Sequence, residues 1–372
     1  MDESGAAGLL TAAGAVLGAV LGEPAALHGS RRSVVLRCRR TGSGSAAGAS
    51  VIVKAYPSSA AGREAFAREA AGLTFAGPAG VGPALLGLDR DFPLLVIEDL
   101  GAQPSLADLL LGTPSPRAGA ALSDWTASCG RLARWSTGRA GEFTRLRAGY
   151  GEPAPGAELA ELPAAISAAP TLLALAGVPV PDGLAGEVAA LGEFAAGEQY
   201  QVFSPGDLCP DNNLVTAVGV RLIDFESAGF HPVFLDAAYL RMPFSTCWCV
   251  LRLPDQLGAA LEQEYRALVC PAFPALADDQ VWHRGVRWAA AAWTLHAMSY
   301  LLDRCVKADQ SMNKDVAGAP SARALLRYRW QSLLAELSAG AELPALAAAM
   351  AGLLAATEHW QAPRLPVYPA LC

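Results

Sequence analysis

The residues from Tyr200 to Gly229 constrain the structure of this chain more than any other stretch. Two short apolar runs, Asn213–Thr216 and Val220–Asp224, are separated by the turn-like sequence Ala217-Val218-Gly219. Runs of this length around such a turn predict a tight β-hairpin with a loop on each side. Three polar side chains stand at the two ends of this predicted hairpin: Asp207, Asn212 and Asp224.

Carboxylate and amide groups in this order suit phosphoryl transfer. A carboxylate beside an acceptor hydroxyl can orient it and accept its proton, while an amide oxygen and a second carboxylate are ligands that Mg²⁺ prefers. The spacing D-x-x-x-x-N, followed by an apolar strand and D-F, matches the catalytic loop and metal-binding aspartate of kinases. An Asp/Asn-rich turn beside a structural hairpin is the alternative interpretation.

The aminoglycoside phosphotransferase family has a signature that this stretch resembles, in the residues Gly206-Asp207-Leu208-Cys209-Pro210-Asp211-Asn212-Asn213-Leu214 and Ile223-Asp224-Phe225-Glu226. That family is similar to choline, homoserine and fructosamine kinases. The resemblance implies an α+β, bilobal protein-kinase-like fold in which Asp207 is the catalytic base and Asn212 and Asp224 hold Mg²⁺. The chain departs from the family at Pro205, where a supporting histidine is usual. This departure concerns the rigidity of the loop more than its chemistry.

Length, composition and charge limit the classes of protein that fit. The 372 residues are 52% hydrophobic and 17% charged, which is typical of a well-packed globular chain of two lobes. A net charge of −7 argues against a nucleic-acid binder. Residues 1–101 hold nine basic and nine acidic groups, so residues 102–372 carry the whole excess of acid. An acidic acceptor lobe suits a cationic substrate, although acidity that serves solubility is the simpler explanation.

The cysteines and the N-terminal segment indicate the cellular compartment in which the protein is expected. None of the eight cysteines forms a C-x-x-C pair, and Cys247-x-Cys249 has no second ligand pair or nearby histidine. We therefore expect reduced thiols in a cytoplasmic protein, without a disulfide framework or zinc site. The apolar segment Leu9–Gly22 is too short to span a bilayer and lacks the basic start of a signal peptide. We expect a short amphipathic helix there and no association with membranes.

One lysine stands out in the first hundred residues. The chain has three lysines against 25 arginines, and Lys54 is the only one before residue 307. It lies in Ser50–Tyr56, whose alternating residues predict a β-strand. A compact ammonium can reach the α- and β-phosphates of a nucleotide as a point charge, where a guanidinium would be bulkier. A solvent-facing lysine at a strand edge is the alternative.

A glutamate in the next predicted element is the expected partner of that lysine. The sequence Gly62–Phe75 predicts a helix with an apolar stripe, and Glu69 borders this stripe while Glu64 faces the opposite side. Its fifteen-residue separation from Lys54 also resembles the lysine–glutamate pair of kinases. We therefore expect a Lys54–Glu69 ion pair, with an ordinary boundary glutamate as the alternative.

Of two further N-terminal stretches, only the first is assigned to the nucleotide, where a kinase-like N-lobe has a loop that covers the phosphates. Ala25–Leu36 predicts two strand-like pieces around a turn, where Gly29 would permit close approach and Ser30 and Ser33 would bind phosphates. A plain hairpin turn explains that sequence equally well. The Gly-rich residues 42–48 predict only a flexible connection between strands.

The adenine site is expected at the end of the last predicted N-lobe strand. Ala84–Leu88 and Leu94–Glu98 predict two strands, and the family carries its hinge at this place. The resemblance implies that backbone groups of Glu98 and Leu100 bind the adenine edge. The boundary between an N-lobe (1–101) and a C-lobe (102–372) is expected at about Gly101.

The remainder predicts a mostly helical C-lobe. Ser105 is expected to cap a helix, and further helices are expected at Asp124–Arg139, Leu257–Val269, Val281–Leu302, Ala322–Leu337 and Leu343–Trp360. The family has an aspartate after the metal loop that supports the catalytic loop through backbone hydrogen bonds. Asp236 is assigned this role, with a plain aspartate at a helix N-terminus as the alternative. No chemistry can be inferred for residues 149–198.

Together these patterns predict an enzyme that uses ATP and Mg²⁺ to phosphorylate a hydroxyl of a small molecule, as monomer or homodimer. GTP is an alternative to ATP. The resemblance suggests an aminoglycoside or another antibiotic as the acceptor, in resistance or self-resistance. The alternatives are a kinase of a primary metabolite and a catalytically weak nucleotide-binding regulatory protein on the same fold.

Overall fold

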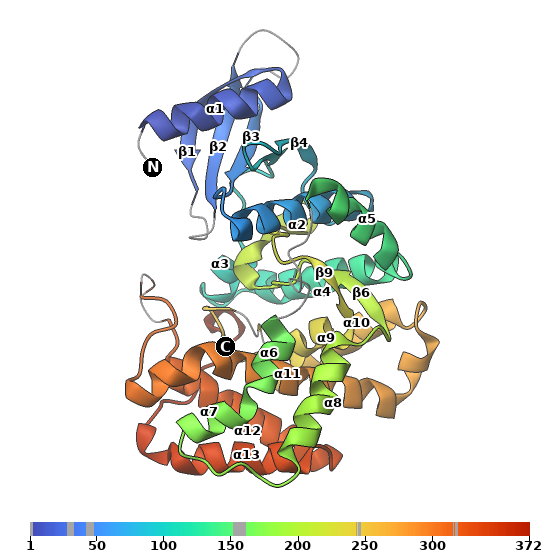
Figure 1. Ribbon diagram of the computed structural model, residues 1–372, viewed down its shortest axis with the longest axis vertical. Helices are drawn as coiled ribbons and strands as arrows, with labels where there is room; N and C mark the ends of the chain where they lie inside the picture. Colours follow the sequence, from blue (N-terminus) through green and yellow to red (C-terminus); the bar gives the residue numbers. More distant parts are fainter. Residues whose placement is uncertain are drawn as a thin grey trace.

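An antiparallel five-stranded sheet forms the N-terminal part of the computed structural model, which describes residues 3–27, 33–41, 48–151, 161–242, 244, 247–314, 316 and 319–372. Its strands have the order β1-β2-β3-β5-β4 (Figure 1). They are β1 (Val20–Ala26), β2 (Val34–Thr41), β3 (Ser50–Ala55), β4 (Leu85–Asp89) and β5 (Leu94–Glu98).

Alternation along β5 gives the sheet two apolar faces. Leu94 and Val96 join a small core with residues of α1 (Glu3–Leu17), whereas Leu95 and Ile97 join the main core together with α2 (Ala60–Ala76). Successive side chains of a strand point to opposite faces, so each face has its own helix. Figure 1 shows α1 across the outer face of the sheet and α2 on the side of the C-terminal part.

The first helix differs from the prediction at its C-terminal end. We expected Leu9–Gly22, but α1 ends at Leu17, and Gly18 takes a φ of +60°. Val20 and Leu21 instead pair with Thr41 and Arg40 of β2. The hydrogen bonds of the sheet edge take these residues out of the helix, although their apolar sequence continues it.

The C-terminal part is helical, as expected. Its helices are α3 (Leu106–Leu110), α4 (Pro116–Ser136), α5 (Ala140–Tyr150), α6 (Glu161–Ser167), α7 (Ala169–Leu175), α8 (Leu184–Ala196), α9 (Phe234–Arg241), α10 (Asp255–Val269), α11 (Asp279–Lys307), α12 (Ala322–Gly340) and α13 (Pro344–Ala356). The long helix α11 packs against α6, α7, α8, α9 and α12. No helix in the described part of the chain is long and apolar enough to cross a bilayer.

Two helix boundaries in this part correct the prediction. The helix expected at Asp124–Arg139 begins eight residues earlier, at Pro116, because Ser115 caps it through a hydrogen bond from the Arg117 amide. The helix expected at Leu343–Trp360 ends at Ala356 and is followed by a 3₁₀ turn. The cap predicted at Ser105 is confirmed, since its hydroxyl accepts a hydrogen bond from the Asp108 amide.

Four short strands lie between the sheet and the helices. β6 (Gln201–Ser204) pairs with β9 (Gly229–Pro232), and β7 (Asn213–Thr216) pairs with β8 (Gly219–Leu222). The second pair is the predicted hairpin. Backbone hydrogen bonds fasten it to the segments that precede β4 and follow β5, from Leu222 to Val81 and from Val215 to Pro104. This fastening fixes the polar ends of the hairpin relative to the sheet.

Candidate active site

The register of the β7–β8 hairpin brings Asn212 and Asp224 together. Asn213 pairs with Leu222, and beyond that pair the Ile223 amide donates to the Asn212 carbonyl over 2.9 Å. The amide side chain and the carboxylate therefore stand at the same open end of the hairpin. Both groups offer oxygen ligands suited to a hard divalent cation.

Lys54 joins this end of the hairpin to the sheet and to α2. Its Nζ lies 2.6 Å from Glu69 Oε2, 2.8 Å from Asp224 Oδ1 and 3.9 Å from Glu226 Oε2. The expected Lys54–Glu69 ion pair is thus present. Glu64 faces away, as predicted, and bonds Arg68 and Arg147.

Burial and charge set the ionisation of this cluster. The side chains of Lys54 and Glu69 are 8% and 2% exposed. Burial alone would lower the pKa of the Lys54 ammonium, but the three carboxylates outweigh it and hold that pKa above its ordinary value. Burial raises the pKa of Glu69, and Lys54 and the Tyr56 hydroxyl, which donates to Glu69, counteract this shift. The lysine is therefore a permanent cation among acids.

The backbone at Asp224 is held in an uncommon conformation. Its φ is +65°, in the left-handed region that non-glycine residues seldom adopt. Phe225 next to it is fully buried and stacks on Phe203 at 6.3 Å between ring centroids. Gly72 of α2 leaves room for that ring, because a Cβ at this glycine would lie 2.9 Å from Phe225 Cβ. The buried phenylalanine thus anchors the carboxylate beside it.

The loop that carries Asp207 is braced by its own backbone. Asp207 Oδ1 accepts a hydrogen bond from the Cys209 amide at 3.3 Å, and Asn212 Nδ2 donates to the Asp207 carbonyl at 3.3 Å. Gly206 has a φ of +85°, and a Cβ there would lie 2.1 Å from the Ser227 carbonyl oxygen. The loop therefore crosses directly over the segment that follows Asp224.

Asp236 is linked to this loop through two paired strands, β9 and β6. It shares a 2.8 Å hydrogen bond with His231 Nε2, and both side chains are buried. His231 belongs to β9, whose partner β6 leads directly into the loop through Ser204 and Pro205. The support that the family resemblance implied at Asp236 is thus relayed through β9 and β6, and its functional role remains a prediction.

The described residues expected to bind the nucleotide lie at the ends of interior strands of the sheet. Asp99 follows β5 and receives two hydrogen bonds from Arg37 of β2, at 2.8 and 3.0 Å, and one from the Gly101 amide at 2.9 Å. The Glu98 amide donates a hydrogen bond to the Ala84 carbonyl. Leu100 lies two residues further on, in the connection to α3. Ser33 directly precedes β2, whereas Gly29 and Ser30 lie outside the described residues. The roles of these residues remain predictions.

Comparison with known proteins is consistent with this geometry. The model of the phosphotransferase enzyme family (APH) matches residues 36–278, which is more than half of the chain. The chain belongs to this family. It is therefore a small-molecule phosphotransferase with the protein-kinase-like fold that the sequence predicted. No curated protein matches the sequence significantly.

Solved kinases share the fold of this phosphotransferase at low sequence identity. A choline kinase from Cryptosporidium parvum has a TM-score of 0.52 and 13% identity, with 87% of this chain and 91% of that chain covered. An amicoumacin kinase solved with AMP-PNP and Ca²⁺ has a TM-score of 0.51 and 14% identity, with 90% of this chain and 93% of that chain covered. A protein from Thermobifida fusca described as a fructosamine-3-kinase has a TM-score of 0.50 and 17% identity, with 88% of this chain and 98% of that chain covered.

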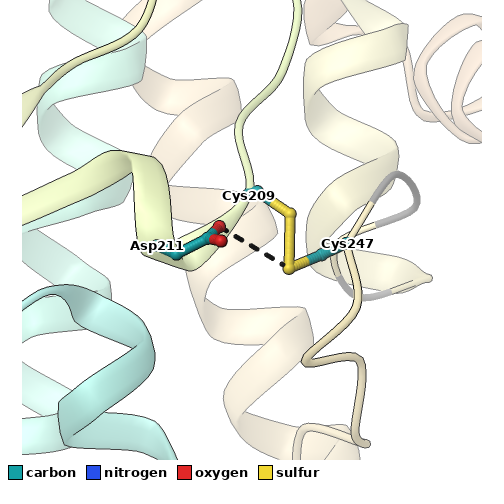
Figure 2. A group of neighbouring side chains, drawn as sticks. All are labelled: Cys209, Asp211 and Cys247. Atoms are coloured by element: carbon teal, nitrogen blue, oxygen red, sulfur yellow. Dashed lines mark hydrogen bonds between the residues drawn. A yellow bond between two sulfur atoms is a disulfide. The ribbon is translucent and has the colours of Figure 1, made fainter. Parts of the chain in front are cut away.

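The expectation of reduced thiols throughout is wrong for one pair of cysteines. Cys209, in the loop of Asp207, is bonded to Cys247 in the segment after α9, 38 residues away (Figure 2). Cys249 Sγ lies 2.8 Å from Cys247 Sγ. Spacing rules cannot reveal such a pair, because the fold alone brings the segment against the loop. The three sulfurs form what we call the sulfur cluster: Cys209, Cys247 and Cys249.

Sequence reasoning also missed two members of the charge cluster. Glu226 was part of the motif but received no role, although the alternation along Asp224-Phe225-Glu226 places both acids on the side opposite the buried ring. Tyr56 ends the predicted strand two residues after Lys54, which would have placed both on one face. These two periodicities were the signals available in the sequence.

Proposed function

We propose that this phosphotransferase uses ATP and Mg²⁺ to phosphorylate a hydroxyl group of a small molecule. The observation that supports this most is the convergence on Lys54 of Glu69 from α2 and Asp224 from the hairpin, with Asn212 held across the register from Ile223. Asp224 is 26% exposed, so its carboxylate is open to a metal ion. Bound Mg²⁺ would neutralise charge on the phosphate oxygens.

Each residue has a distinct role in this proposal. Asp207 orients the acceptor hydroxyl and takes its proton, while Asn212 and Asp224 hold the metal ion. Lys54, positioned by Glu69, turns its ammonium to the α- and β-phosphates. Lys54 and Asp224 contact each other directly. When the nucleotide binds, the ammonium of Lys54 must therefore turn toward the phosphates and the carboxylate of Asp224 toward the metal ion. Catalysis then consists mainly of positioning and charge neutralisation.

Backbone groups of the hinge bind the base in the same proposal. Glu98 and Leu100 lie where the strand β5 leaves the sheet, and Ser33 lies at the start of β2 on the side of the phosphates. Hinge bonds of this kind use main-chain atoms, so the side chains do not decide between ATP and GTP. A nucleotide competition experiment distinguishes the two.

For the acceptor we propose an aminoglycoside or another cationic antibiotic. The negative charges of Asp211, Asp207 and Asp108 act together on the buried Cys249 thiol and, after burial, raise its pKa. These carboxylates are close enough to the loop to act on one group, and such a field would favour a cationic acceptor. A kinase of a primary metabolite of the choline or fructosamine type is the alternative.

Calorimetry of nucleotide binding and a turnover assay test the proposal together. We expect Asp224→Ala to lose Mg²⁺-dependent ATP binding. Asp207→Asn should bind the nucleotide within about twofold of wild type, yet lose at least about 100-fold in turnover because it has no proton acceptor. Acceptors are found by screening hydroxylated antibiotics and metabolites for the mass gain of a phosphate.

The matched control is Asp303→Ala, which removes an exposed aspartate that bonds only Lys307 among the contacts described here. It should leave both measurements unchanged. Wild-type turnover by Asp207→Asn would contradict the assignment of the base, and failure of the unmodified protein to bind ATP or GTP would contradict the kinase reaction.

A further inference from the structure

One member of the sulfur cluster, Cys209, lies in the catalytic loop between the proposed base Asp207 and the proposed metal ligand Asn212. Cys209 is two residues after Asp207 and three before Asn212. Its amide donates to Asp207 Oδ1, and its carbonyl accepts from the Asn212 amide at 2.9 Å. A displacement of Cys209 therefore reaches the proposed base and the proposed metal ligand at once.

The partner segment is fastened to the loop at a second point. Trp248 Nε1 donates to Asp211 Oδ2 at 2.7 Å, and Cys247 Sγ lies 3.8 Å from Asp211 Oδ1. Figure 2 shows Asp211 directed toward the bonded sulfurs. The disulfide thus closes a contact that the indole and the carboxylate already align, and it adds a covalent link across 38 residues.

We propose that Cys209, Cys247 and Cys249 form a thiol–disulfide switch that controls the order of the catalytic loop. In the bonded state Cys209 is held, and Asp207 and Asn212 keep the positions described above. Reduction by a dithiol supplies two electrons and two protons, gives two thiols and releases the loop. A disulfide-forming oxidant such as oxidised glutathione reverses the step. In a reducing compartment a disulfide of this kind is usually transient or redox-sensing.

Cys249 gives Cys247 a second partner. Attack by its thiolate on Cys247 Sγ would form a Cys247–Cys249 disulfide and expel Cys209 as the thiolate, which takes up the proton that Cys249 lost. No external oxidant is needed, since one disulfide replaces another. Burial, with Asp211 and Asp207, raises the pKa of Cys249; the attacking thiolate is therefore scarce, and the exchange is slow at neutral pH.

A metal ion is the competing occupant of the same cluster. Three thiolates and the Asp211 carboxylate would suit Zn²⁺. The bonded pair contains no thiolate, however, and Asp211 is already engaged by Trp248. The observations therefore favour the disulfide, and the metal is an outcome of the test.

The sulfur state is measured first, on the full chain purified without reductant. Alkylation under denaturing conditions followed by peptide mapping should find Cys209 linked to Cys247 or, after exchange, Cys247 linked to Cys249. The native protein, analysed for metal before alkylation, should contain no stoichiometric zinc. Complete alkylation of all three cysteines in protein that has never been reduced, or one equivalent of zinc per chain, would overturn the switch.

Hydrogen exchange then measures the loop itself. We expect amides of residues 205–214 to exchange about tenfold faster after reduction by dithiothreitol, because the covalent link no longer limits local opening. The matched variant Cys249→Ser retains the Cys209–Cys247 bond and should show the same change, whereas Cys372→Ser, at an exposed site, serves as the control for thiol treatment. Equal exchange before and after reduction would refute the proposal.

The effect of the switch on turnover rests on the proposed function, whereas thiol mapping and hydrogen exchange do not depend on it. Turnover of the acceptor should fall at least about threefold on reduction and return on reoxidation. If thiol mapping and hydrogen exchange succeed while no turnover is detected in either state, the proposed reaction fails and the switch stands. If turnover is present and identical in both states, the switch fails and the reaction stands.

Discussion

Lys54 connects three separate elements through its ammonium group. We expect Lys54→Met to lower the free energy of unfolding by about 3 kcal/mol, because it leaves Glu69 buried without its cation. Chemical denaturation in urea measures this loss. The double variant Lys54→Met/Glu69→Leu should recover most of the stability while nucleotide binding stays weak. A single variant as stable as the native protein would show that the buried carboxylates do not need this cation.

Asp99 gives the hinge a dependence on pH. Burial alone would raise its pKa, but hydrogen bonds from Arg37, Ser50 and the Gly101 amide hold the pKa below its ordinary value of 3.8. A carboxyl group whose pKa is depressed by folding stabilises the protein above its unfolded pKa, and this contribution is lost as pH falls through the folded pKa.

We therefore expect Asp99→Asn to lower the free energy of unfolding by about 1.5 kcal/mol at pH 7, the typical contribution of hydrogen bonds to a charged group. The difference from the native protein should persist down to about pH 4 and shrink below it. Urea midpoints at a series of pH values measure this. A difference that stays constant into the acid range would mean that Asp99 is not stabilised as a carboxylate.

At the scale of elements, α2 controls the position of Asp224 at the end of the hairpin. Gly72→Ala would place a Cβ 2.9 Å from Phe225 Cβ and 3.1 Å from Ala228 Cβ, so Phe225 and the adjacent Asp224 must shift. We expect the free energy of unfolding to fall by about 1–3 kcal/mol and Mg²⁺-dependent ATP affinity to fall with it. Urea denaturation and calorimetry measure the two effects.

Gly192→Ala in α8 is the matched control, because an added Cβ there meets no atom within 4 Å. This variant should keep both stability and affinity near those of the native protein. Equal effects at the two glycines would indicate that α2 tolerates a side chain at Gly72 and does not position Phe225.

The sequence predicted those elements whose information is local. The hairpin followed from two apolar runs and a turn, and the Lys54–Glu69 pair followed from a strand, a helical stripe and their separation. The predicted start of α4 was too late, although Ser115 and Pro116 carry the signal of a cap and a first helical residue. Residues 116–121 contain only proline, arginine, glycine and alanine, which form no clear amphipathic stripe. The Cys209–Cys247 bond could not be predicted, since only the tertiary packing of the segment after α9 brings the sulfurs together.

At the scale of the whole molecule, one large core joins the two lobes. It runs from Leu95 and Ile97 of the sheet, through Phe225, to the C-terminal helices, whereas the smaller core lies only between α1 and the outer face of the sheet. The candidate site is built on the larger core. Displacement of α1 should therefore disturb the site less than displacement of α2.

The distribution of charge over the whole molecule makes the proposed cationic acceptor testable. Residues 102–372 hold 26 acidic and 19 basic groups, while residues 1–101 are balanced. If this field draws a cationic acceptor to Asp207, raising ionic strength from about 0.01 M to about 0.15 M should weaken it, since the screening length falls from about 30 Å to about 8 Å.

We expect the KM of a polycationic aminoglycoside acceptor to rise at least about threefold over this range, with ATP held saturating. The KM of a neutral hydroxylated acceptor serves as the control and should change little, because the field exerts no net attraction on it. Equal salt dependence for the two acceptors, or phosphorylation confined to neutral ones, would show that the acidity of the C-terminal part serves solubility and does not select the substrate.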